Sequence, residues 1–311
     1  MKKVLSIFLV FVLAISCKPK ASLNQPFPLL NVPSMINGQD EELDYIVIHY
    51  WEPFFSENRE YPSDTSLLLG ISKEAFRQAY MEYITYLTAV SVPKSLQAQQ
   101  ILLDKAEAFQ TSHSDCNIWR EVIALSDIFL FDPNSPFRSE EMYIPVQEKL
   151  LNSPLASKEQ KTEAARLLPL LKLNRLGTTA TDFLFTLRNG RQMKLSDIQA
   201  QFTILLFSNP DCENCKEVIE YIGSLNEVDN LINNKFLAVV NVHPDSDLTQ
   251  WFEYASIYPS NWYNGFDQDM VIADKLYNIR AIPAVYLLDK NKTVILKDAP
   301  IETVIAYLQN L

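Results

Sequence analysis

The 311-residue sequence lacks the motifs of several large enzyme classes. It has only six glycines, and no GxGxxG or GxxxxGK[ST] motif for dinucleotides or nucleoside triphosphates occurs. The three histidines (His49, His113 and His243) lie far apart, without HExxH, so we expect no catalytic zinc. The net charge of −11 argues against nucleic-acid partners, which require a positive surface. With 48% hydrophobic residues the chain is globular, and its chemistry must be sought among four cysteines.

The N-terminus has the pattern of an export signal. A basic start precedes an apolar run from Val4 to Ile15, which is too short to span a bilayer core of about 30 Å. The run ends just before Cys17 and resembles a bacterial lipoprotein signal, although a leucine stands four rather than three residues before the cysteine. We predict a signal peptide and lipobox over residues 1–17, with lipidation at Cys17. Plain secretion and an uncleaved anchor are the alternatives.

A polar tether over residues 18–36 would then separate the folded part from the membrane. No acidic run follows the lipobox to suggest surface export, so we predict a membrane-anchored lipoprotein of the cell envelope that faces the periplasm. Disulfide chemistry is possible in such a compartment.

Residues 37–174 predict a mainly α-helical domain, because apolar residues recur at spacings of three to four. Helices are expected after Ser72, from Pro93, over Ile118–Phe129, over Glu140–Leu151 and over Ser157–Leu173. The segment Tyr45–Ile48 fits a strand or a helical turn, and its periodicity does not decide between them.

Residues 175–311 have the texture of an α/β domain. Continuous apolar runs are typical of central strands, and turn residues between two alternating segments indicate a hairpin. Strands are expected at Phe183–Leu187, Phe202–Phe207, Phe236–Val240, Ala284–Leu288 and Thr293–Leu296, with helices from near Cys212 and over Ile301–Leu311. This order predicts a mixed sheet covered on both faces, and a domain boundary near residue 175.

Cys212 and Cys215 form a CxxC motif between a predicted buried strand and a predicted helix. A spacing of three brings the two sulfurs within disulfide reach, and the first lies where free N–H groups and the helix dipole favour a thiolate. We expect Cys212 to attack a substrate disulfide and Cys215 to resolve the mixed disulfide that forms. This chemistry needs no cofactor. A structural zinc site, which would need two more ligands, and an inert structural disulfide are the alternatives.

Residues 177–311 resemble a thioredoxin-fold module of the TlpA/ResA-like branch of thiol–disulfide oxidoreductases. The lead-in DFxxTLxxGxxxxLSD (Asp182 to Asp197), the CxxC and the dipeptide Ile282-Pro283 carry this resemblance. It implies an α/β thioredoxin-like fold in which Pro283 is cis and faces the CxxC, while the backbone of Ile282 binds the substrate peptide. An ordinary turn is the alternative for this dipeptide.

An aromatic-rich insertion also resembles this branch, and we interpret its rings as core rather than substrate contacts. It contains Trp251, Trp262, Tyr263 and Phe266.

Several positions depart from the family pattern. Leu206 and Val218 stand at two positions where family members hold a proton-accepting acid. Ser208 replaces the usual aromatic residue, and Asn209 stands where a peroxiredoxin would have a threonine. In addition, Asp211 and Glu213 flank Cys212 and oppose the dipole, so we expect a modestly lowered thiol pKa and a potential nearer thioredoxin's about −270 mV than DsbA's about −120 mV.

The first half resembles, through Tyr50–Phe54 and its helix order, a helical domain of unknown function that precedes thioredoxin-like modules in Bacteroidetes lipoproteins. This resemblance implies no activity. Cys116 lies close to His113, but we interpret it as a buried structural cysteine rather than a nucleophile.

Together these patterns predict a lipid-anchored, extracytoplasmic thiol–disulfide oxidoreductase that acts as a reductant or isomerase. Its partners would be oxidised client proteins, a thiol donor and, through the lipid anchor, the membrane. The alternative is a non-catalytic binding or adaptor lipoprotein that keeps the fold and a structural disulfide.

Overall fold

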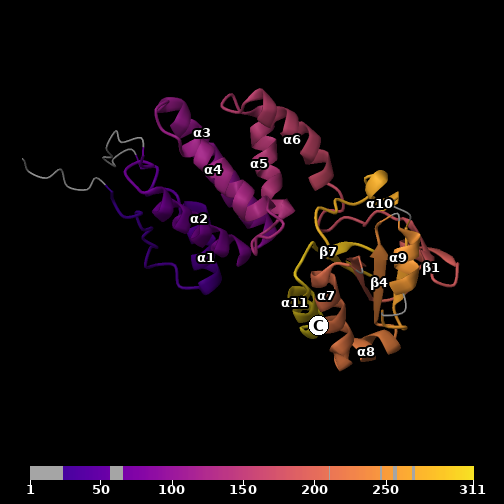
Figure 1. Ribbon diagram of the computed structural model, residues 1–311. Coiled ribbons are helices and arrows are strands. Elements are labelled where there is room, and N and C mark those ends of the chain that lie inside the picture. The colour runs from indigo at the N-terminus through magenta and orange to yellow at the C-terminus, as the bar shows by residue number, and fades with distance from the viewer. Residues whose placement is uncertain (1–23, 57–65, 210, 246, 255–257, 268–269) are drawn as a thin grey trace, which may run out of the picture.

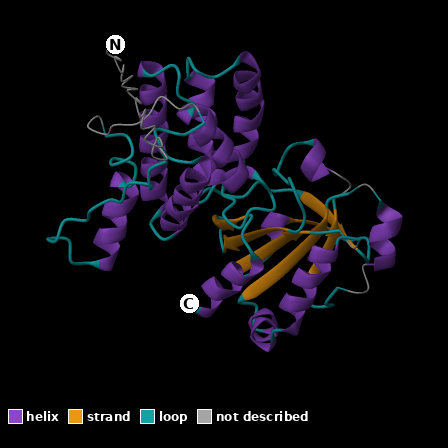
Figure 2. Ribbon diagram, turned by 60° about the vertical axis from the view of Figure 1, so that its left-hand side comes forward, coloured by secondary structure: helices purple, strands orange, loops and turns teal. Residues whose placement is uncertain are grey.

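The computed structural model describes residues 24–56, 66–209, 211–245, 247–254, 258–267 and 270–311. They form a helical half and a half built on one β-sheet, which lie next to each other (Figures 1 and 2). Cys17 lies outside the described residues, so its lipidation stays a prediction. Among the helices that are described, none combines the length and apolar character needed to cross a membrane.

The helical half follows the sequence pattern closely. Its elements are α1 (Gln39–His49), α2 (Lys73–Thr88), α3 (Val92–Ser112), α4 (Ile118–Ser126), the π-helical turn η1 (Asp127–Phe131), α5 (Glu140–Asn152) and α6 (Lys158–Leu171). The hydroxyl of Ser72 caps α2 by accepting from the N–H of Ala75 (3.2 Å), and Ser157 and Gln160 form a capping box on α6. The ambiguous segment Tyr45–Ile48 is helical and belongs to α1.

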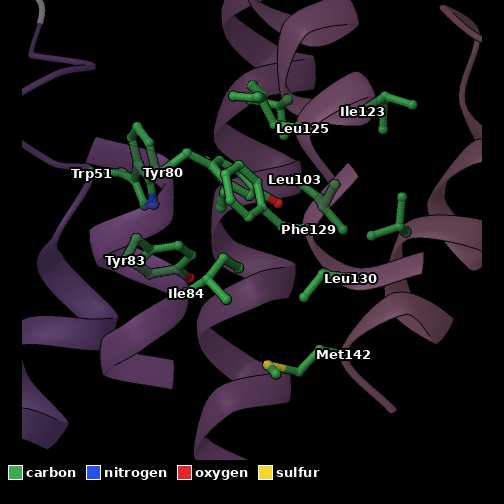
Figure 3. Close-up of a cluster of buried hydrophobic side chains, with 14 of the residues drawn as sticks. Trp51, Tyr80, Tyr83, Ile84, Leu103, Ile123, Leu125, Phe129, Leu130 and Met142 are labelled. Atoms are coloured by element: carbon green, nitrogen blue, oxygen red, sulfur yellow. The ribbon is translucent and has the colours of Figure 1, made fainter. Parts of the chain in front are cut away.

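Aromatic side chains dominate the core of the helical half. Figure 3 shows Trp51, Tyr80 and Tyr83 packed with aliphatic residues of α3, α4 and η1. The ring of Tyr80 lies 5.8 Å from that of Phe129 in η1, and its hydroxyl reaches Ser126 Oγ at 2.8 Å. This half therefore has a hydrophobic core of its own.

The second half contains one seven-stranded mixed sheet in the order β2-β1-β5-β4-β3-β6-β7. The strands are β1 (Leu184–Leu187), β2 (Gln192–Lys194), β3 (Phe202–Phe207), β4 (Leu237–His243), β5 (Tyr263–Phe266), β6 (Ala284–Asp289) and β7 (Val294–Lys297). β4 is parallel to β3 and β5, and the other pairs are antiparallel. Both predicted hairpins, β1–β2 and β6–β7, are confirmed.

Helices and loops cover both faces of the sheet, as predicted. The helical elements are η2 (Leu195–Asp197), α7 (Glu213–Ser224), α8 (Asn226–Asn233), α9 (Leu248–Tyr254), α10 (Met270–Ala273) and α11 (Ile301–Gln309). Helices α7 and α11 supply the apolar side chains of one face, and the other face packs on the segment before β1, on η2 and on α10. The fold is a thioredoxin-like α/β fold, so the predicted fold class is confirmed.

The aromatic insertion contains strand β5, which the sequence pattern did not reveal. β5 includes Gly265, where a Cβ atom would lie 2.5 Å from Cδ2 of the buried Phe185, so only glycine leaves room for that ring. Trp251, Trp262 and Phe266 are buried, which confirms their interpretation as core residues, and Tyr263 is half-buried.

Candidate functional site

The cysteine pair lies at the start of α7. Cys212 is the N-cap residue of that helix, and its Cα lies 5.2 Å from that of Cys215, with the two sulfurs at bonding distance. The backbone N–H of Cys215 donates to Sγ of Cys212 at 3.2 Å. A free N–H of the first helical turn thus points at the sulfur, which stabilises negative charge there once the disulfide is reduced.

The two cysteines differ in their access to solvent. Cys212 is half-buried, whereas Cys215 is completely buried at 0% exposure. Of the two residues, Cys212 is therefore the one that another molecule can reach, and Cys215 is shielded by the fold.

The Ile282–Pro283 dipeptide lies directly opposite the cysteine pair. Its peptide bond is cis, as the resemblance implies, and it precedes strand β6. The carbonyl oxygen of Ile282 lies 3.6 Å from Sγ of Cys212. The structure therefore brings together the two predicted parts of the site, which are separated by 70 residues in the sequence.

A cavity of about 400 Å³ adjoins this pair of loops. It is lined by Asn209, Pro244, Asp245, Ile272, Ile279, Arg280, Ala281 and Ile282. The cavity therefore lies between the segment that leads into the CxxC and the segment that leads into β6.

The two carboxylates that flank Cys212 are both exposed. The amide of Gln250 donates to Asp211, and Glu213, with its side chain 79% exposed, pairs with Lys216 at 3.4 Å. Exposed charges are screened by water and salt, so their opposition to a thiolate at Cys212 is weak.

The strands below α7 carry a buried polar network in place of the family's usual residues. Leu206 is completely buried, and Ser208 donates to Oδ1 of Asn241 at 2.5 Å. Asn241 in turn donates to Oδ1 of Asn264 at 3.5 Å. Sequence reasoning missed Asn241 because a single polar residue at the end of an apolar run resembles the end of a strand.

His243 is a buried titratable residue at the end of β4. It is 1% exposed and its ring stacks on that of Phe266, with centroids 5.9 Å apart. Burial lowers the pKa of His243, and the nearby carboxylate of Asp245 opposes this only in part. The imidazole is therefore neutral at neutral pH.

The buried histidine makes the fold sensitive to acid. In the unfolded chain His243 binds a proton near pH 6.5, whereas the folded protein binds it only at lower pH, so stability falls as the pH drops through 6.5. Between pH 7.5 and 5.5 we expect this residue to remove up to about 1.4 kcal/mol of unfolding free energy. Denaturant titrations of the wild type and His243→Gln at both pH values measure this loss. Equal pH dependence in the two proteins would contradict the prediction.

Cys116 shows no sign of activation. It is half-buried rather than buried, its Sγ lies 3.5 Å from Oε1 of Gln110, and burial raises the pKa of the thiol. His113 stacks on Phe109 with centroids 4.2 Å apart. These contacts support a structural role for Cys116.

The fold and this site together define a thioredoxin-like protein, and comparisons with known proteins give the family. Residues 13–174, more than half of the chain, match a domain of unknown function (DUF5106), and residues 200–294 match a thioredoxin-like family. The chain therefore belongs to the thioredoxin-like proteins that carry this helical domain in front of the thioredoxin fold.

A solved structure that aligns over most of the chain supports this assignment. A thioredoxin-like protein from Bacteroides caccae is 31% identical, with a TM-score of 0.80 over 92% of this chain and 99% of that chain. The C-terminal domain of an uncharacterized protein from Bacteroides fragilis is 42% identical, covering 44% of this chain and 98% of that one, with a TM-score of 0.42.

A curated protein with a named activity is similar to part of the chain. The thiol-disulfide oxidoreductase ResA of Geobacillus kaustophilus is 28% identical over 120 residues. This match covers 38% of this chain and 66% of the length of that protein.

Proposed function

We propose that this protein is a lipid-anchored thiol–disulfide oxidoreductase of the cell envelope, which reduces or isomerises disulfides of client proteins. One observation carries the proposal: a half-buried sulfur, Cys212, faces the carbonyl of Ile282 and receives an N–H from Cys215, whose own sulfur is completely buried. Similarity to ResA supports the reaction class, and the lipoprotein-like N-terminus supports the location.

The reaction begins with the reduced protein. The thiolate of Cys212 attacks one sulfur of a client disulfide, so that a Cys212–client bond forms and the first client thiolate leaves. The thiolate of Cys215 then attacks Sγ of Cys212, which forms the internal disulfide and releases the second client thiolate. A thiol donor returns two electrons to the pair, and in isomerisation the client's own thiolate replaces Cys215 in the second step.

The backbone of Ile282 is the proposed docking edge for the client chain. Its carbonyl lies next to Cys212, so an extended peptide that pairs with it would bring its own sulfur within reach. Asp211 and Glu213 are exposed, so their repulsion of a thiolate at Cys212 is screened, and the helix terminus is the main electrostatic influence on this sulfur.

A non-catalytic adaptor is the competing function, and one observation favours it. Leu206 and Val218 occupy the two positions at which family members hold a carboxylate, so neither can accept the proton of Cys215. The two functions differ in whether Cys212 exchanges disulfides with another molecule.

Removing the resolving thiol distinguishes the two functions. Cys215→Ser leaves Cys212 free to attack but removes the group that would release the client, so we expect a stable mixed disulfide with a fluorescent peptide that carries an intramolecular disulfide. Non-reducing electrophoresis and mass spectrometry measure the adduct. The matched control is the double variant Cys212→Ser/Cys215→Ser, which should form none. The adaptor function would hold if Cys215→Ser forms no more adduct than this control.

A further inference from the structure

A buried ion cluster joins the helical half to the sheet half next to the proposed substrate edge. Glu140, the first residue of α5, has a side chain only 4% exposed. Its Oε1 accepts from Nδ2 of Asn278 at 2.5 Å and lies 3.2 Å from Nε of Arg280, while its Oε2 lies 2.7 Å from Nζ of Lys297. Among the described residues, these polar contacts of Glu140 all reach the sheet half.

Arg280 is held from a second direction by the end of η1. Its Nη1 donates to the carbonyl of Phe131, and its guanidinium lies 4.3 Å from the centroid of that residue's ring. Carbonyls in the last turn of a helix have no intrahelical donor, so this one is available to Arg280. The side chain of Arg280 is 13% exposed, and besides these contacts with the helical half its Nη2 lies 3.9 Å from Oδ2 of Asp298 in the sheet half.

The same arginine belongs to the wall of the site. Arg280 lines the 400 Å³ cavity, and it stands two residues before Ile282, whose carbonyl lies 3.6 Å from Sγ of Cys212. Two residues span at most about 7 Å of chain, so a displacement of Arg280 is transmitted to Ile282.

We propose that Glu140 is a positioning residue: by holding Asn278 and Arg280, the helical half sets the position of the Ile282 backbone against Cys212 and so governs how well a client peptide docks. This proposal rests on the proposed function. It gives the helical domain a role in substrate binding, although that domain supplies no reacting group. Its effect should appear in peptide affinity and leave the intrinsic reactivity of Cys212 unchanged.

A neighbouring pair provides a matched control. Glu141, the next residue of α5, is bound by Arg175, whose Nε donates to Oε1 of Glu141 at 3.0 Å. Like the pair of Glu140 and Arg280, the pair of Glu141 and Arg175 joins a buried glutamate of α5 to an arginine. It makes no use of residues 278–282. Arg175→Met therefore breaks an ion pair of α5 without releasing Arg280.

The experiment compares full-length wild type, Glu140→Gln and Arg175→Met. Reduction of the disulfide peptide, with dithiothreitol as donor, should show a KM raised about tenfold in Glu140→Gln alone, with kcat within about twofold of the wild type. The rate at which iodoacetamide alkylates reduced Cys212 should be equal in all three proteins. Hydrogen exchange at the amides of Ala281 and Ile282 should become faster in Glu140→Gln but not in Arg175→Met.

The outcomes separate this proposal from the proposed function. An active wild type with the same KM in Glu140→Gln and Arg175→Met would overturn the positioning role alone. A wild type that does not reduce the peptide would overturn both. If Glu140→Gln does not fold, Arg280→Lys takes its place, because it keeps the charge but loses the planar contact with Phe131, and the same shift in KM is expected.

Discussion

Cys212→Ser should lower the rate of disulfide reduction by at least about a thousandfold, because it removes the nucleophile from the one accessible position of the pair. Cys215 cannot substitute for it, since Cys215 is completely buried. A serine hydroxyl stays protonated at neutral pH and does not exchange with disulfides. Turnover of the fluorescent disulfide peptide, with dithiothreitol as the donor, measures the loss.

Two controls show that this loss arises from the chemistry. The unfolding midpoint of Cys212→Ser in reducing buffer should match that of the reduced wild type, because the half-buried sulfur contributes little packing. Cys116→Ser should keep full activity, since Cys116 lies in the helical half and its thiol pKa is raised by burial. Retention of more than about a tenth of the wild-type rate by Cys212→Ser would rule out the proposed mechanism.

Lys297→Met should destabilise the protein by about 3–5 kcal/mol, the usual cost of removing one partner from a buried ion pair. The side chain of Lys297 is 4% exposed, and its Nζ lies 2.7 Å from Oε2 of Glu140. The same ammonium donates to the carbonyls of Leu171 and Leu173, where α6 ends. In Lys297→Met the buried carboxylate of Glu140 loses one of its positively charged partners, and the carbonyls of Leu171 and Leu173 lose the ammonium that donates to them.

Chemical denaturation followed by tryptophan fluorescence measures the loss of stability in Lys297→Met. Trp51 and Trp119 report on the helical half, and Trp251 and Trp262 report on the sheet half. The double variant Glu140→Gln/Lys297→Met should recover part of the stability, since it no longer buries an incompletely paired carboxylate.

An exposed lysine serves as the control for this measurement. Lys172 pairs with Glu148 at 2.7 Å, but both side chains are more than 40% exposed, so Lys172→Met should cost less than about 1 kcal/mol. If Lys297→Met costs no more than Lys172→Met, the buried cluster does not stabilise the contact between the two halves.

Local patterns in the sequence were sufficient to predict most elements and the position of the cysteine pair. The apolar run Phe202–Phe207, followed by a CxxC with helical spacing behind it, predicted a buried strand, a helix start and a nucleophile at its N-cap. Ile282-Pro283 before a second apolar run pointed to the facing loop through family resemblance. The predictions of the strand and of the helix start succeed because periodicity and capping depend on residues within one turn or one strand of each other.

Short elements with polar or glycine residues were missed. β5 consists of Tyr263–Phe266 and includes Asn264 and Gly265, so it lacks an apolar run; it forms because β4 and β1 pair with it on either side. The helix α8 was likewise not foreseen from its short, polar sequence.

The sequence alone thus identified the thioredoxin-like fold, the CxxC and the loop that faces it. The burial of Glu140, Arg280 and Lys297 followed only from the packing of the two halves, because a charged residue in a local pattern is expected to face water. Glu140 and Arg280 are 140 residues apart, and nothing near either one indicates its partner. Whether a charge is solvated or paired depends on which distant segments exclude water from it, and this is a property of the folded chain.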